Sequence, residues 1–561
     1  MPLMQRLQGL RIEYLLPAIT VVLAIYGLSL LLNPAITWSN PEYLVYSVPG
    51  AMDNGLGFKW NDLLKAFDPL TFGDINVIRP RFLNYLITVL NVKFRLALYE
   101  HFIPPVNLSL MLLVHLVVSP LLLFMTARNL VKSGSIAFLA ACLYMTSVGF
   151  LSTGVFFVQP GKVLIHPLAL LLFWVLSVMQ KRDEEKYFAE QSPLLVALVF
   201  GLNFIALSLD DTYALVSLVA CVLFWRLFIP KALTGLHMKR AVLSAFVFFV
   251  PFLLFAAFVW KVAPGLSEAA GVGHCDYIGQ LLGQSLTVAK TPLWPVFRDL
   301  STTALASSLL VRPYPEAMSG VGLRLSNIQA IFVTAMPAAM AIFAFMQARK
   351  TPSAPDWKSN PVTAPFAALV LYFALQAFLQ RFHVQITGSY YYASLSAIFV
   401  SIFIACVIAS LHSLHSRVRR AGIAGILILM AVQLANFIDI NQRWKIMHMP
   451  VIPFSLSSVR GIYQNVVTDD GAAPSAEQLQ RMKKIWNEWK NGRRTDLSAE
   501  PKWPGSEAWF LIEMNALSGF VYRDKVKHCG DRTGALIQEI DRHVTKQDLL
   551  DGQRTVRRLA S

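Results

Sequence analysis

The chain alternates long apolar stretches with short polar ones, at a spacing typical of membrane-spanning helices. A span needs about 20 mostly apolar residues. About eleven stretches meet or approach that length: Tyr14–Leu32, Val106–Thr126, Ser135–Leu151, Val163–Met179, Leu194–Leu209, Tyr213–Phe228, Ala241–Lys261, Ile328–Met346, Phe366–Leu379, Tyr391–Ala409 and Ala421–Ile438. The pattern predicts an all-α polytopic membrane protein with about eleven transmembrane helices.

Composition strengthens this prediction. The 561 residues are 55% hydrophobic and only 15% charged, whereas soluble domains carry about 25% charged residues. The first apolar stretch has no evident small-residue cleavage site, so we expect it to act as a signal anchor.

Basic residues recur in every second segment between the apolar stretches. They are Arg6 and Arg11 before the first stretch, and then "ARNLVKSGS", "KRDEEKYFAEQ", "KALTGLHMKR", "ARKTPSAPDWKSN" and "HSLHSRVRR". The positive-inside rule places these segments, and the N-terminus, in the cytoplasm. An odd number of spans then places the C-terminus outside. The net charge of +16 is explained by this orientation, and no basic patch interleaved with aromatic residues points to nucleic acid.

The opposite side of the membrane receives the long polar segments. Loops 33–105 and 262–327 and the tail 441–561 all fall there. Long connections of this kind are usually functional or folded. We therefore expect a transmembrane domain over 1–440 and a small α-rich or mixed soluble domain over 441–561.

Two cysteines and one glycosylation sequon bear on the compartment. Cys275 and Cys529 both fall on the outer side, where they could form a disulfide or remain two free thiols. The sequence Asn107-Leu-Ser, at a membrane boundary, is the sole sequon in the chain. So few sequons favour a bacterial inner membrane over a eukaryotic lumenal location.

Carboxylates in the first outer loop are candidates for acid–base chemistry. Asp74 precedes Arg79 and Arg81 near the second apolar stretch, and Asp53 lies further upstream. A carboxylate kept ionised by guanidinium groups that can also grip a phosphate suits a general base. The alternative is a structural ion pair that pins the loop.

Further polar residues fall at the same outer face. Asp210 and Asp211 end the fifth stretch, where they could bind a divalent cation such as Mg²⁺ or Mn²⁺, line a cavity, or simply form a polar turn. Lys162, Arg312 and Arg381 could hold a lipid phosphate, although a lysine here could also snorkel to headgroups. Because these residues all fall at the outer surface of the membrane, the sequence predicts a cavity there that accepts an anionic lipid headgroup.

Several short motifs occur in an order that resembles the GT-C superfamily of membrane glycosyltransferases, and most closely its O-mannosyltransferase-like group, without that group's repeats. They are "VIRPRFLNYL" with Arg79, "PPVNLSLMLLVH" with Asn107 and His115, Pro160-Gly161-Lys162, Ser208-Leu209-Asp210-Asp211-Thr212, and the run from Gly388 to Ser394. The likeness covers most of the membrane part and none of the tail.

The resemblance implies transfer of a sugar from a polyprenyl-phosphate donor to an envelope glycan, lipid or protein acceptor outside the cytoplasm. It also shows departures. The family's acidic pair early in the first loop reads Ser47-Val48 here, and a Glu-Arg pair of the late motif reads Gly388-Ser389. Asp53 or Asp74 could replace the missing acid. Alternatively, the fold serves as a scaffold or accessory subunit without transfer activity. A transporter fits less well, because its charges would lie near mid-membrane.

Overall fold

A computed structural model describes a helical core of the chain. The described residues are 83–84, 86–87, 90–91, 94, 110–147, 149–150, 153, 160–210, 213–229, 234–269, 294–295, 342, 346, 362–380, 394–411, 423–425, 427–428, 430 and 433. The first apolar stretch, most of loops 33–105 and 262–327, and the whole tail 441–561 lie outside them.

The described part is all-α, as the pattern predicts, and no strand occurs within it. Its α-helices are α5 Leu110–Val131, α6 Gly134–Thr146, α8 Pro160–Arg182, α9 Pro193–Leu209, α10 Tyr213–Leu223, α11 Gly235–Ala257, α12 Ala263–Ala269, α16 Thr363–Gln380 and α18 Ser396–Leu411. Two 3₁₀ turns, η3 Phe188–Glu190 and η4 Trp225–Leu227, follow α8 and α10. A π-helical turn, η5 Phe258–Val262, joins α11 to α12.

Three helical segments are long and apolar enough to cross a membrane: Leu113–Val131, Val163–Arg182 and Gly235–Leu266. The shorter apolar helices α6, α9, α10, α16 and α18 also coincide with predicted stretches. The full count of eleven spans remains a prediction, because much of the chain lies outside the described residues.

The boundaries differ most at α11. The polar character of residues 235–240 predicts a loop, yet they form the first turns of this helix. Lys239 and Arg240 are exposed there, so their charged ends remain accessible while the backbone hydrogen-bonds within the helix. At the other end the helix continues through η5 into α12, at the start of the predicted loop 262–327.

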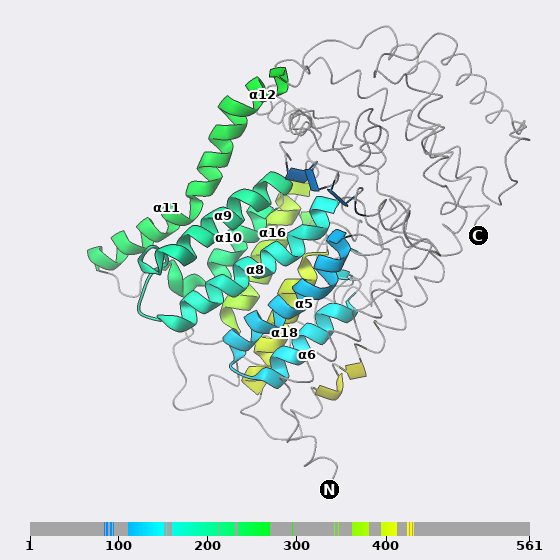
Figure 1. Ribbon diagram of the computed structural model, residues 1–561. Helices are drawn as coiled ribbons and strands as arrows, with labels where there is room; N and C mark the ends of the chain where they lie inside the picture. The colour runs from blue at the N-terminus through cyan, green and yellow to red at the C-terminus, as the bar shows by residue number, and fades with distance from the viewer. Residues whose placement is uncertain are drawn as a thin grey trace, which may run out of the picture.

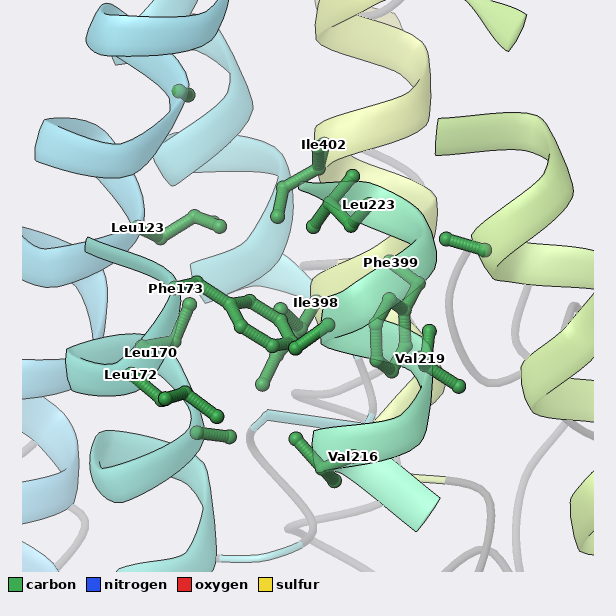
Figure 2. Close-up of a cluster of buried hydrophobic side chains, with 14 of the residues drawn as sticks. Leu123, Leu170, Leu172, Phe173, Val216, Val219, Leu223, Ile398, Phe399 and Ile402 are labelled. Carbon is green, nitrogen blue, oxygen red and sulfur yellow. The ribbon is translucent and has the colours of Figure 1, made fainter. Parts of the chain in front are cut away.

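α8 lies at the centre of the described bundle. It packs against α5, α9 and α10, while α18 contacts α5, α6 and α16 (Figure 1). α11 lies at the edge and packs against α9 and η3. The core between these helices gathers Leu170, Phe173, Val219, Ile398 and Phe399 (Figure 2). The rings of Phe173 and Phe399 have centroids 5.5 Å apart.

The ends of the helices that carry the basic residues meet at one end of the bundle. Near the close of α5 and α8, Asn129 Nδ2 donates to Ser177 Oγ at 3.0 Å, and Lys181 Nζ donates to Asn129 Oδ1 at 3.3 Å. Arg240 at the start of α11 pairs with Glu190 of η3 at 3.2 Å. These contacts fix the helix ends against one another where charges can stay solvated.

At the opposite end, the segment after α6 approaches the start of α18 closely. A Cβ added at Gly149 would lie 2.9 Å from the Ser394 carbonyl oxygen and 3.1 Å from Ala397 Cβ. Only hydrogen fits there without a shift of the backbone.

We predict that Gly149→Ala destabilises the protein by about 1–3 kcal/mol, because overpacking forces backbone movement. Gly201→Ala is the matched control, since nothing lies within 4 Å of a Cβ at that helical position. Unfolding of the purified protein in detergent measures both. Equal stability of the two variants would contradict the close approach.

Candidate functional site

Buried polar side chains gather at the end of the bundle opposite the basic residues. We call this group the histidine cluster: His115 and Ser119 of α5, Tyr144 of α6, Thr153, His166 of α8, and Ser394 just before α18. All of them are buried. In an apolar bundle no water is at hand to satisfy such groups, so each must find a protein partner.

His115 is held at both ring nitrogens. Its Nε2 lies 3.2 Å from the Phe150 carbonyl oxygen, and its Nδ1 lies 3.2 Å from Ser119 Oγ, one helical turn along α5. A carbonyl can only accept, so Nε2 carries the proton. In the neutral ring, Nδ1 then accepts from the Ser119 hydroxyl.

His166 links three further segments. Tyr144 Oη lies 2.8 Å from its Nδ1, while Ser394 Oγ and Thr153 Oγ1 lie 3.1 Å and 3.5 Å from its Nε2. Thr153 donates its hydroxyl proton to the Gly149 carbonyl at 2.7 Å, so it can only accept from His166. We therefore assign the proton of the neutral His166 ring to Nε2, with Tyr144 donating to Nδ1.

The two imidazoles also contact each other. Their centroids are 4.9 Å apart in an edge-on arrangement at 78°. This contact joins α5 and α8, so the cluster connects α5, α6, α8, the residues around 150 and the start of α18 into one unit.

Two asparagines upstream of α5 cap helix starts next to the cluster. Asn84 Oδ1 accepts from the Gly161 backbone N–H at 2.9 Å, in the first turn of α8. Asn91 Oδ1 accepts from the Met111 N–H at 3.4 Å, in the first turn of α5. Both asparagines are helical and buried. Each satisfies an N–H that a helix start leaves open.

The end of α9 is also buried. Asp210 ends α9 with no exposed surface, and its carbonyl accepts from the Tyr213 N–H at 3.2 Å. One layer deeper, Ser217 Oγ donates to Asn203 Oδ1 at 3.0 Å. Asp210 is thus enclosed rather than solvated, and its neighbour Asp211 lies outside the described residues.

The remaining predicted site residues fall mostly outside the described part of the chain. This holds for Asp53, Asp74, Arg79, Arg81, Asp211, Arg312, Arg381, Cys275 and Cys529, while Lys162 is described only as a backbone position in the first turn of α8. Among the described residues, no group of three or more His, Cys, Asp or Glu side chains could hold a metal ion.

Sequence reasoning found part of the cluster. Its members His115 and Ser394 stand in the motifs of the resemblance, and His166 lies four residues after the candidate Lys162. Gly161, which bonds to Asn84 next to the cluster, stands in a further motif. The sequence gives no role to the other three members, Ser119, Tyr144 and Thr153, nor to the capping residue Asn91. Tyr144 offered one signal: it lies inside an apolar helix, where a tyrosine hydroxyl needs a partner.

Comparisons with known protein families, curated proteins and solved structures found no match.

The contact of Asn84 with Gly161 gives a compensation test. A Cβ at Gly161 would collide with the Asn84 amide. We predict that Gly161→Ala costs about 1–3 kcal/mol in the wild-type background and clearly less in an Asn84→Ala background, where the colliding amide is gone. Thermal unfolding of the four proteins measures this, and strictly additive effects would contradict the contact.

The pair of Tyr144 and His166 gives a second test. We predict that Tyr144→Phe costs about 1–3 kcal/mol, because a buried acceptor loses its donor. In a double-mutant cycle with His166→Leu, the coupling should be about 0.5–3 kcal/mol. A coupling indistinguishable from zero would show that the hydrogen bond is absent.

Proposed function

We propose that this protein is a polytopic membrane glycosyltransferase of the GT-C type, which moves a sugar from a polyprenyl-phosphate donor to an acceptor outside the cytoplasm. One observation carries the proposal. Four segments that resemble the family's motifs, around Asn84, His115, Gly161 and Ser394, meet at one end of the bundle. The predicted topology already places these segments on one side of the membrane, and the contacts between them are what support the proposal.

The charge distribution supports the orientation that this activity needs. The described ends opposite the histidine cluster carry Arg128, Lys132, Lys181, Arg182, Lys186, Arg226, Lys239 and Arg240 against four acids, Asp183, Glu184, Glu185 and Glu190. By the positive-inside rule this end faces the cytoplasm. The cluster then lies toward the outer leaflet, as expected for a bacterial inner-membrane protein with its C-terminus in the periplasm.

The first loop is connected to the end of the bundle that contains the histidine cluster. Arg81 lies three residues before Asn84 in the sequence. Asn84 in turn bonds to the start of α8, the helix turn that contains Lys162. The contact of Asn84 with the start of α8 supports the proposal that Arg81 and Lys162 bind the same phosphate.

In the proposed reaction, Asp74 or Asp53 removes the proton from the acceptor hydroxyl. The acceptor oxygen attacks the anomeric carbon, a new glycosidic bond forms, and the bond to the lipid phosphate breaks with inversion. Arg79, Arg81, Lys162, Arg312 and Arg381 stabilise the departing phosphate. Asp210 and Asp211 orient the acceptor or hold a divalent cation.

The histidine cluster serves this chemistry by holding the segments in place. Each nitrogen of His115 and His166 already has a protein partner. Rings engaged in this way are poor candidates for proton transfer to a substrate, so the base is assigned to the loop carboxylates.

A second candidate is an accessory or scaffold subunit with the same fold but no transfer activity. The observation that favours it is the loss of two family features, which read Ser47-Val48 and Gly388-Ser389 in this chain. Such a subunit would keep the cluster, because the cluster holds the fold, and would not need the loop carboxylates.

We predict that purified protein in lipid nanodiscs transfers labelled sugar from a polyprenyl-phosphate sugar to acceptors extracted from envelopes. Replacing the base costs about 10²–10⁴ in rate, so Asp74→Asn or Asp53→Asn should lose activity by that factor. Asp62→Asn and Asp68→Asn in the same loop are the controls and should retain it. Full activity with both Asp53 and Asp74 neutralised, or no transfer by the wild-type protein, would favour the scaffold.

A further inference from the structure

The longest apolar helix of the described bundle presents most of its surface outward. The continuous segment Gly235–Leu266 runs through α11, η5 and the start of α12 at the edge of the bundle (Figure 1). The buried residues of this segment are Ala241, Ser244, Phe248, Pro251, Val259, Ala263 and Pro264. The large exposed side chains are Leu236, Met238, Val242, Leu243, Phe246, Leu253, Leu254, Trp260 and Val262.

Both ends of this exposed surface carry residue types that interact with lipid headgroups. Lys239 and Arg240 are exposed at one end. At the other end Trp260 is 60% exposed, and Lys261 Nζ lies 4.0 Å from the centre of its ring. Tryptophan favours the membrane interface, and lysine extends its ammonium toward phosphate groups.

The distance between the two ends of this surface matches the thickness of the hydrocarbon core of a bilayer. Arg240 and Trp260 are separated by about 20 helical residues, or about 30 Å at 1.5 Å per residue. The hydrocarbon core of a bilayer is also about 30 Å thick. No charged residue occurs between Arg240 and Trp260.

We propose that the exposed face of α11 is covered by phospholipid, with one bilayer boundary at Lys239–Arg240 and the other at Trp260–Lys261. Acyl chains cover the apolar interval between them, and the Lys261 ammonium binds a headgroup phosphate of the outer leaflet. This inference does not depend on the proposed glycosyltransferase activity.

The residue types favour lipid over a second copy of the chain. Close helix pairing in membranes uses small residues four apart, which let backbones approach. Among the exposed residues between Arg240 and Trp260, no two small residues are spaced four apart. Their surface is instead formed largely by bulky Leu and Phe side chains, which suit fluid acyl chains.

The boundaries also set the depth of the histidine cluster. Lys181 and Arg182 end α8 at the same end of the bundle as Arg240. His166 lies about 16 residues before Arg182, or about 24 Å along the helix. The cluster therefore lies about 6 Å inside the outer boundary, within hydrocarbon, while α12 continues beyond the boundary.

Spin labels on single cysteines test this placement in the full chain, reconstituted in phosphatidylethanolamine–phosphatidylglycerol vesicles, with the five native cysteines replaced. Met238→Cys and Val262→Cys should report shallow positions, near the two headgroup layers. Phe246→Cys and Leu253→Cys should report deep positions, with access to oxygen and protection from a water-soluble nickel complex. Ala241→Cys, at a buried position, is the control and should be protected from both.

Equal water access at all four outward positions, or a label at 262 as deep as one at 253, would overturn the placement. If the cysteine-free background fails to fold, benzoylphenylalanine at 246 and 253 of the otherwise native chain replaces the labels. Photoadducts of lipid mass are then expected, and adducts of the mass of two chains would overturn the proposal in favour of a second copy.

Weaker retention of phosphatidylglycerol by Lys261→Glu than by Lys261→Arg is expected, and equal retention would overturn the phosphate contact.

Discussion

The described structure depends on one constraint: burying a polar group among apolar helices without a hydrogen-bond partner costs free energy. Lipid tails are as apolar as leucine, so apolar contacts alone favour no single arrangement of helices in a membrane. His166 illustrates how polar contacts select one. Its two nitrogens reach Tyr144 of α6 and Ser394 before α18, so a shift of α8 against either neighbour would strand a buried polar atom.

The same constraint explains why the bundle is held at both ends. Asn129, Ser177 and Lys181 join α5 and α8 near the basic end, and the contact of His115 with His166 joins the same helices near the other end. Between these two sets of polar contacts the core is apolar, with Phe173 and Phe399 in contact at its centre. Polar contacts therefore set the register, and close packing of large side chains fills the space between them. Asn84, from the segment before α5, bonds to the start of α8, and the proposed transfer chemistry is located there.

The sequence predicted the helices better than the contacts between them. Apolar stretches identified α5, α6, α8, α9, α10, α16 and α18, because burial in lipid or protein demands apolar side chains along a whole helix. The sequence pattern wrongly predicts a loop at the start of α11. Lys239 and Arg240 are charged, but a helix can expose them at its first turns. The motifs around His115, Gly161 and Ser394 pointed to one end of the bundle, but no periodicity could pair Tyr144 with His166, which are joined only by the fold. The role of the loop carboxylates stays a prediction.

The most direct test of this account is the position of the protons on the two buried imidazoles. Nitrogen-15 labelling of histidine, with His115→Gln and His166→Gln for assignment, distinguishes a protonated from an accepting ring nitrogen by chemical shift. The account predicts a proton on Nε2 and an accepting Nδ1 in both rings, with the His166 Nδ1 shift changed by Tyr144→Phe and the His115 shifts nearly unchanged. A proton on Nδ1 of His166, or rings that average both forms, would contradict the hydrogen bonds on which the fold and the proposed site rest.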